Sequence, residues 1–152
     1  MIVVPRNDHE SFQLCVWAAH ILKQDPIRNA RSIAVVKDNK IVGVVILHDW
    51  SPPNVFLSWA SSTPRWMSRD LLLHVFNWAF VQLKCTRITG LVERNNKRAR
   101  EIDERLGMKL EGVLRKAAPS GRDLMVYGLL REEAEQLMLR IYRGKTARLP
   151  ST

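Results

Sequence analysis

The stretch that decides the fold runs over residues 87–131 and reads RITGLVERNNKRAREIDERLGMKLEGVLRKAAPSGRDLMVYGLLR. Its apolar run at residues 88–92 is typical of a strand. Asn95 or Asn96 can cap the charged helix that follows, and Gly107 supplies the residue at which that helix ends. Two more strands and the turn between them are expected at residues 108–115, 124–130 and 119–121. The stretch therefore predicts the order strand, helix, strand, strand.

Upstream of this stretch, helix and strand patterns alternate. A first helix is expected over residues 9–24, with Asp8 as its N-cap and Asp25 followed by Pro26 as its end. A second helix, over residues 67–83, carries an apolar stripe at intervals of three and four residues. The expected strands lie at residues 32–36, 41–48 and 55–60, with a hairpin turn at 37–40. With a last helix over 132–142, this order predicts a mixed sheet flanked by helices.

Length and composition favour one globular domain. The chain has 152 residues, of which 46% are hydrophobic and 26% are charged. We expect a single domain over residues 1–152, with a core over about 8–131 and a C-terminal helix and basic tail over 132–152. No apolar run approaches the roughly 20 residues that span a bilayer, and the first residues lack a secretory-signal pattern. A cytoplasmic protein is therefore expected.

The cysteines and histidines do not form a recognisable site. Cys15 and Cys85 are far apart in the sequence, and we interpret both as reduced structural thiols, with a disulfide between them as the alternative. The four histidines show no spacing typical of metal ligands, so no metal is expected. Among them, His48 ends an apolar strand, where it can either face a cleft or be a hydrogen-bonded structural residue.

The formal net charge is +9, and the positive residues concentrate in two places. The first is the segment from Arg94 to Arg100, and the second is the tail, with Arg140, Arg143, Lys145 and Arg148. Such a surface attracts anionic cofactors, nucleic acid or acidic proteins. The alternative interpretation is an ordinary solvated surface.

The start and end of the helix within residues 87–131 resemble those of a known family. Asn96-Lys97-Arg98-Ala99 begins the helix, and Leu106-Gly107-Met108 ends it. This spacing is similar to the C-terminal half of the GCN5-related N-acetyltransferases, which use acetyl-CoA. The resemblance implies an α/β (α+β) fold with a mixed, mostly antiparallel central sheet flanked by helices. The segment Glu111-Gly112-x-x-Arg115 looks most like the ribosomal-protein N-terminal acetyltransferases and small phage-encoded members.

In this family, a loop of the form Gln/Arg-x-x-Gly-x-Gly/Ala and the helix after it hold the CoA pyrophosphate. Free N–H groups and the helix dipole favour an anion there. The corresponding residues here, 59–70, contain no glycine. Either Pro64 and Trp66 occupy the glycine positions, or Arg65 begins the motif and Ser68 takes the first glycine position. The alternative to CoA binding is a capped helix start with Trp66 in the core.

The resemblance assigns CoA contacts to two segments. The expected cofactor-binding residues are Trp59, Ala60, Ser61, Arg65, Trp66, Met67, Ser68 and Arg69 in the first segment, and Asn96 and Ala99 in the second. The asparagine can equally be an N-cap without any ligand. Strand amides near residues 58–60 are expected to polarise the thioester carbonyl.

Catalytic residues are less clearly marked. The family often has a tyrosine acid at the position of Asp103, and an ionised carboxylate is a poor proton donor. Glu93, near the end of its strand, is the expected general base, with a surface ion pair to a neighbouring arginine as the alternative. Tyr127 is the expected acid or acyl-orienting group. The alternative for Tyr127 is a core residue with a hydrogen-bonded hydroxyl.

The resemblance therefore implies an N-acetyltransferase that moves an acetyl group from acetyl-CoA to a primary amine. Direct attack in a ternary complex is expected, in a monomer or homodimer. The alternative function is a non-catalytic binding module on the same fold, whose basic surface binds nucleic acid or an acidic protein.

Overall fold

The computed structural model describes residues 1–142. Contacts divide the chain between two compact units. Unit 1 comprises residues 1–51 and 55–75, and unit 2 comprises residues 52–54 and the chain from residue 76 onward. The tail positions Arg143, Lys145 and Arg148 lie outside the described residues. The single-domain assignment stays a prediction.

The strands of unit 1 follow the order β1-β2-β3-β4. They are β1 (Ile2–Val3), β2 (Arg31–Lys37), β3 (Lys40–Ser51) and β4 (Asn54–Ser61). β1 pairs antiparallel with β2, and β2 pairs antiparallel with β3. The predicted hairpin turn is confirmed, because Asp38 and Asn39 both have positive φ (50° and 58°), as a two-residue turn between twisted strands requires. β1 was missed, since two residues are too short to show a strand pattern.

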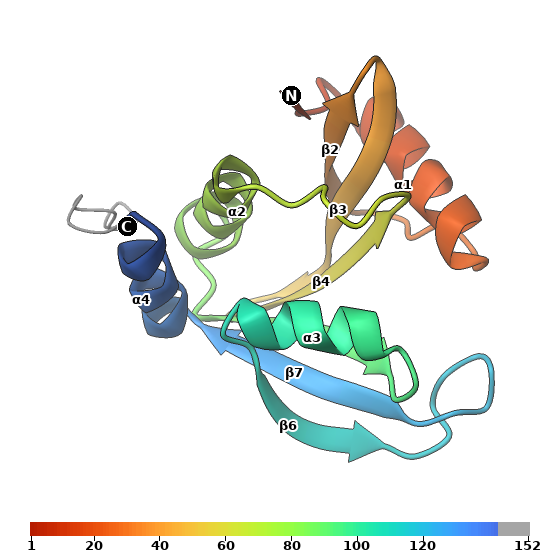
Figure 1. Ribbon diagram of the computed structural model, residues 1–152, viewed down its shortest axis with the longest axis vertical. Coiled ribbons are helices and arrows are strands. Elements are labelled where there is room, and N and C mark those ends of the chain that lie inside the picture. The colour runs from red at the N-terminus through yellow and green to blue at the C-terminus, as the bar shows by residue number, and fades with distance from the viewer. Residues whose placement is uncertain (143–152) are drawn as a thin grey trace. The chain divides into compact units, whose positions relative to one another are not determined.

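Helix α1 (Asp8–Leu22) lies alongside β2 and β3 (Figure 1). Its N-cap is Asn7, whose Oδ1 accepts a hydrogen bond of 2.9 Å from the Glu10 amide. The prediction of Asp8 as N-cap was therefore wrong: Asn7 has the extended backbone of a cap, and Asp8 is the first helical residue. The helix ends at Lys23, which takes a left-handed conformation before Pro26 is reached. Its buried side packs against the sheet in a cluster of Cys15, Ala18, Ala34, Val44, Ile46 and Ala60.

The second predicted helix is present, in two forms. It begins as α2 (Arg69–Phe76), two residues later than expected, and continues as the π-helix η1 (Asn77–Gln82). The π-helical part shows its wider turn where the Leu83 amide donates to the Trp78 carbonyl at 2.9 Å. Its side chains Ala79 and Phe80 are fully buried.

Unit 2 contains the fold-determining stretch at residues 87–131. Its strands are β5 (Arg87–Glu93), β6 (Lys109–Leu114) and β7 (Leu124–Leu130), in the order β5-β7-β6, and both pairings are antiparallel. Its helices are α3 (Lys97–Arg105) and α4 (Arg131–Tyr142). Gly107 ends α3 with φ of +84°, as predicted, because a residue without Cβ takes this conformation at little cost. The predicted class, an α/β fold with mostly antiparallel strands flanked by helices, is confirmed.

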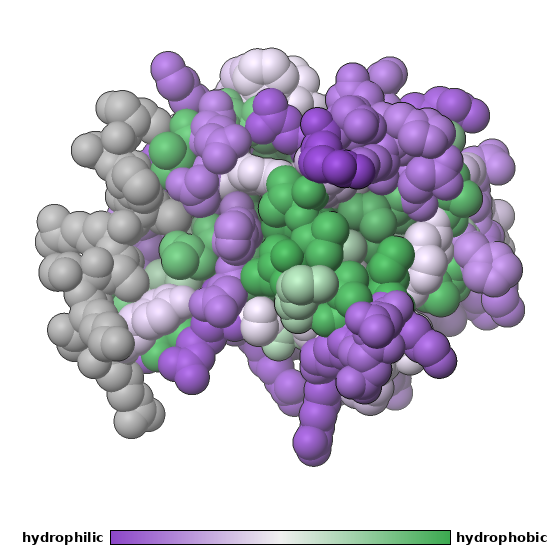
Figure 2. All heavy atoms as spheres, turned by 90° about the horizontal axis from the view of Figure 1, so that it is seen from above, coloured by the Kyte–Doolittle hydropathy of each residue, from purple (hydrophilic) through white to green (hydrophobic). Residues whose placement is uncertain are grey.

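Charged and polar side chains cover much of the surface, with hydrophobic residues gathered in one region of the face shown in Figure 2. Among residues 1–142, no helix has both the length and the apolar composition needed to cross a membrane.

Both cysteine thiols are expected to resist chemical modification in the folded protein. Cys15 and Cys85 are not in a disulfide and are almost fully buried, and burial raises the pKa of the Cys15 thiol. The thiolate is the reactive form, so a raised pKa and poor access both slow the reaction. A colorimetric thiol titration should detect both thiols only after denaturant is added. Rapid reaction of either thiol without denaturant would contradict this expectation.

Candidate functional site

The segment at residues 62–68, here called the 62–68 loop, is fastened to the sheet of unit 1. The Ser62 amide donates to the Val42 carbonyl at 3.0 Å, and Lys37 Nζ donates to the Arg65 carbonyl. Trp66 is only 1% exposed and lies against Gly43 of β3, where a Cβ on residue 43 would overlap the indole ring. The loop contains no glycine, but its position depends on the glycine at position 43, which leaves room for the indole ring.

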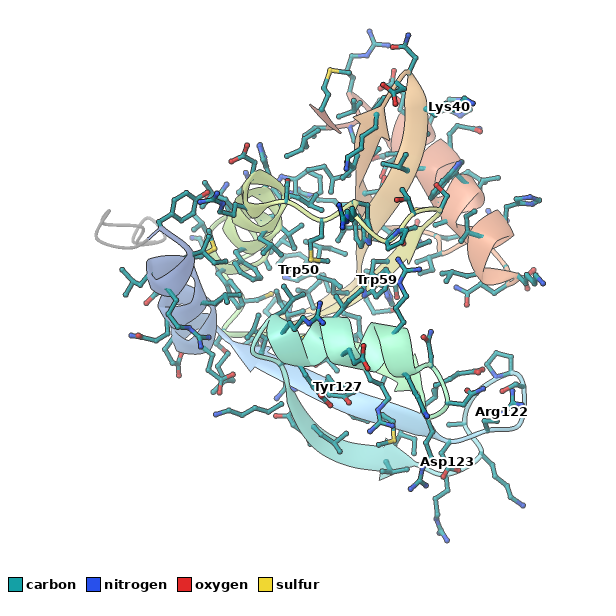
Figure 3. The ribbon with its side chains drawn as sticks, viewed as in Figure 1. Lys40, Trp50, Trp59, Arg122, Asp123 and Tyr127 are labelled. Atoms are coloured by element: carbon teal, nitrogen blue, oxygen red, sulfur yellow. The ribbon has the colours of Figure 1, made fainter. Side chains whose placement is uncertain are left out.

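Trp59 of β4 completes this attachment. The rings of Trp59 and Trp66 have centroids 5.3 Å apart and planes inclined by 32°. Trp59 is labelled in Figure 3. The Trp66 side chain is a core residue, as the alternative interpretation of the sequence predicted. The side chains of Trp66 and Ala60 are both buried, so only main-chain atoms of these two residues can contact a ligand.

The 62–68 loop leads into the N-terminus of α2, which favours an anion. Ser68 caps the helix: its Oγ accepts from the Leu71 amide at 3.1 Å. The amides of Arg69 and Asp70 fall in the first turn, where an α-helix offers them no carbonyl partner. Lys37, Arg65 and Arg69 are exposed around this region. The arrangement supplies both the helix dipole and positive side chains that phosphate binding requires.

A second polar group lies on β3 and β4 of unit 1. His48 Nδ1 lies 2.6 Å from Asp49 Oδ2, and His48 Nε2 lies 2.8 Å from Ser58 Oγ. The Phe56 ring stacks on the imidazole at a centroid distance of 5.9 Å. In the sequence, only His48 of this group stood out, as the polar residue at the end of an apolar strand. The position of Ser58 ten residues later gave no signal, because only the pairing of the two strands brings it to the ring.

In unit 2, the predicted CoA contacts Asn96 and Ala99 form the helix cap. Asn96 Oδ1 accepts a hydrogen bond of 3.2 Å from the Ala99 amide. The first turn of α3 contains Lys97, Arg98 and Arg100 and no acidic residue, so its positive end is not neutralised within the helix.

The two predicted catalytic residues are each held by hydrogen bonds within unit 2. Glu93 Oε1 accepts from Ser120 Oγ at 2.8 Å, while the neighbouring Arg94 pairs with Asp123 at 3.0 Å. The ion pair expected as the alternative thus joins Arg94 to a different carboxylate. Figure 3 labels Asp123 in the loop before β7 and Tyr127 on β7.

Tyr127 has no exposed surface. Its hydroxyl donates to Glu104 Oε1 at 3.1 Å and accepts from Arg100 Nε at 3.2 Å. The hydrogen bond to Tyr127 raises the pKa of the Arg100 guanidinium. Both partners belong to α3, so the hydroxyl fastens this helix to the sheet of unit 2. Asp103, at the position of the family's tyrosine acid, is also buried.

Comparison with solved structures identifies the fold. A putative acetyltransferase from T. thermophilus matches with a TM-score of 0.65 and 26% identity, over 81% of this chain and 69% of that one. A GNAT-family acetyltransferase from Streptococcus pneumoniae matches with a TM-score of 0.65 and 16% identity, over 86% of this chain and 98% of that one. This chain therefore shares the fold of these acetyltransferases, which is the fold expected for a GCN5-related N-acetyltransferase.

A third structural neighbour is the spermidine/spermine N-acetyltransferase SpeG from Vibrio cholerae. It matches with a TM-score of 0.68 and 13% identity, over 90% of this chain and 98% of that one. No family model and no curated protein sequence matches the chain. Acetyl transfer is the chemistry of these neighbours, whereas their low identity carries no acceptor over to this chain. The likeness to ribosomal-protein and phage members stays a prediction.

Proposed function

We propose that this protein is an acetyl-CoA-dependent N-acetyltransferase whose acceptor is a primary amine. The observation that carries the proposal is the basic, capped helix start at Ser68 and Arg69, on the superfamily's fold. The amine attacks the thioester directly in a ternary complex. A covalent cysteine intermediate is not proposed, because Cys15 and Cys85 are both buried.

The residues of unit 1 fit the anionic part of acetyl-CoA. The Arg69 and Asp70 amides and the side chains of Arg65 and Arg69 hold phosphate in this proposal, and Lys37 adds a further positive charge. Main-chain groups of Ser61 and Met67 border the same segment. The segment has no glycine, so its proposed phosphate contacts are the amides of the helix start and the arginine side chains.

Acetyl-CoA supplies an acetyl thioester, a reactive acyl donor. In this proposal, amides of β4 near residues 58–60 stabilise negative charge on the carbonyl oxygen. In unit 2, Glu93 is one candidate proton acceptor, and Asn96 and Ala99, which form the cap of α3, are candidate CoA contacts. Tyr127 contributes by orienting α3, since its hydroxyl proton is donated to Glu104.

We expect acetyl-CoA binding to depend on Arg65 and Arg69. Isothermal titration calorimetry should show saturable binding to the unmodified chain and a loss of at least about tenfold in the double variant Arg65→Ala/Arg69→Ala, because each charge-assisted bond contributes about 1.5–3 kcal/mol. The matched control is Arg6→Ala/Lys40→Ala, which removes the same charge from exposed positions of unit 1. Equal losses in the two variants would indicate a nonspecific charge effect.

The acceptor is to be found by screening amines for acetyl-CoA-dependent thiol release. A panel of a peptide N-terminus, a lysine peptide, an aminoglycoside and spermidine covers the main amine classes. No acetyl-CoA binding, together with salt-sensitive binding to random DNA or RNA, would instead support the non-catalytic binding module. Two arginines of that basic surface already have partners within unit 2: Arg94 pairs with Asp123, and Arg100 binds Tyr127.

A further inference from the structure

We infer that Asp49, His48 and Ser58 form a proton relay that takes the proton from the acceptor amine. The inference rests on the proposed N-acetyltransferase function. At neutral pH a primary alkylamine is mostly protonated, so it must lose a proton before its nitrogen can attack a thioester. The question is which group of this chain receives that proton.

The hydrogen bonds fix the form of the imidazole. An ionised Asp49 has only acceptor oxygens, so the contact of 2.6 Å requires His48 Nδ1 to carry a proton and donate it. In a neutral ring, Nε2 then has a free lone pair, which accepts from the Ser58 hydroxyl at 2.8 Å. The basic nitrogen therefore points at Ser58 Oγ, with a carboxylate behind the ring. This is the order of groups that makes a hydroxyl able to pass on a proton.

The ring is held in this orientation from three directions. Asp49 bonds one nitrogen, Ser58 bonds the other, and Phe56 stacks on the ring face. Asp49 itself has a φ of +48°, an uncommon conformation for a residue other than glycine. This local backbone cost is of the kind that is found where a side chain must be aimed.

The relay lies on the side of the unit 1 sheet that faces α1. Side chains alternate along a strand, so His48 faces the same side of β3 as Val44 and Ile46, and Ser58 faces the same side of β4 as Ala60. Val44, Ile46 and Ala60 pack with α1, which identifies this side of the sheet. Ser58 also belongs to the part of β4 whose amides are proposed to polarise the thioester.

The members of the relay differ in exposure. The His48 side chain is 14% exposed, whereas that of Asp49 is 76% exposed. A positive charge on the His48 ring is therefore stabilised by the adjoining Asp49 carboxylate, which itself stays hydrated. Only the ring has to become charged in a sheltered setting, and it does so beside a carboxylate.

Ser58 Oγ accepts a proton from the ammonium nitrogen while its own proton moves to His48 Nε2. The neutral amine then forms the C–N bond to the acetyl carbon, the C–S bond breaks, and the nitrogen gives its second surplus proton to the leaving thiolate. The proton on His48 Nε2 returns through Ser58 Oγ to water, so the relay regains its starting form.

Glu93 is the competing proton acceptor. Its carboxylate accepts a hydrogen bond from Ser120. Among the contacts of residues 1–142, no further group orients this carboxylate in the way that Asp49 orients His48. The relay has a base, a residue that orients the base and a hydroxyl that receives the proton. It is therefore the more complete proton-accepting group.

The test compares His48→Gln, Ser58→Ala and Asp49→Asn in acetyl-CoA-dependent thiol release, using the best amine of the panel. His20→Gln is the matched control, since it makes the same exchange at an exposed residue of unit 1. We expect kcat to fall by about 100-fold or more in His48→Gln, the usual range for general-base catalysis, with acetyl-CoA affinity unchanged by calorimetry. Thermal unfolding of each variant checks that folding is intact.

A second acceptor separates proton removal from a structural role. Hydroxylamine is largely unprotonated at neutral pH, so it does not need the relay. With hydroxylamine, the kcat of His48→Gln should lie within about tenfold of the kcat of the unmodified chain. This difference is much smaller than the loss expected from removing a general base. Equal losses with both acceptors would overturn the relay, because a misfolded site affects them alike.

Two further outcomes would also be decisive. Full activity in His48→Gln, with activity lost in Glu93→Gln, would overturn the relay and leave the acetyltransferase proposal intact. Absence of acetyl-CoA-dependent thiol release in the unmodified chain, with every amine, would overturn the proposed function and the relay's role together.

Discussion

Replacing Trp66 with alanine is expected to lower the free energy of unfolding by about 3–5 kcal/mol, the cost typical of truncating a buried aromatic residue. The side chain is 1% exposed and packs between Gly43 and Trp59. Its removal leaves a cavity under the 62–68 loop. Urea unfolding followed by circular dichroism measures the loss, and an effect below about 1 kcal/mol would contradict the packing described here.

Trp66→Phe tests the contribution of the N–H group separately from that of an aromatic ring. Trp66 Nε1 is buried and has no hydrogen-bond partner among the described residues. A buried donor without a partner costs about 1–3 kcal/mol, so its removal offsets part of the area lost with the larger ring. Trp66→Phe should therefore destabilise the protein much less than Trp66→Ala.

Gly43→Ala provides the reciprocal control. In the unmodified chain, the new Cβ overlaps the Trp66 ring, so the substitution should be destabilising. In the Trp66→Ala background the ring is gone, and Gly43→Ala should become neutral or stabilising, since alanine suits a strand better than glycine. A change of sign across this cycle would establish the contact. Purely additive effects would contradict it.

Loss of Trp66 should also weaken acetyl-CoA binding, although its side chain is buried. The loop is fastened to the sheet at Ser62, Arg65 and Trp66, and the first two contacts involve only main-chain groups of the loop. Without the indole ring, the loop has more conformations to lose on binding a phosphate group. Weaker binding with an intact fold would connect the packing of this loop to function.

The elements of the fold were predictable because each leaves a local signal. Asp38 and Asn39 mark a hairpin turn, Asn96 marks a helix start and Gly107 marks a helix end. The failures are also local in origin. Asn7 and Asp8 are both good caps, and backbone conformation alone decides between them. The π-helical turn from Asn77 has no marker in the sequence, because its residues also suit an α-helix.

The site was less predictable, because its contacts join residues that are distant in the sequence. Gly43 leaves the space that the Trp66 ring fills, but in the sequence neither residue indicates the other. Lys37 reaches the Arg65 carbonyl only because β2 ends beside the loop. The sequence can identify a residue type suited to a task, such as His48, and the strand pairing supplies its partner.

Replacing Tyr127 with alanine is expected to destabilise the protein by about 3–5 kcal/mol, as for other fully buried aromatic residues. Tyr127→Phe retains the ring and should cost about 0.5–1.5 kcal/mol, because it removes two partly buried hydrogen bonds whose partner Glu104 is exposed to water. The hydroxyl joins β7 to Arg100 and Glu104 of α3. Urea unfolding of both variants measures these costs.

The kinetics of Tyr127→Phe distinguish an orienting residue from an acid. A tyrosine that protonated the leaving thiolate would lower kcat by about 100-fold or more on losing its hydroxyl. The hydroxyl proton is instead donated to Glu104, and the side chain has no exposed surface from which to reach a ligand. We therefore expect Tyr127→Phe to lose stability while kcat stays within about tenfold of the unmodified chain. Glu104→Gln is the matched control: it keeps an acceptor for the hydroxyl, so it should preserve both stability and kcat. A large fall in kcat with stability retained in Tyr127→Phe would instead indicate that Tyr127 acts as an acid.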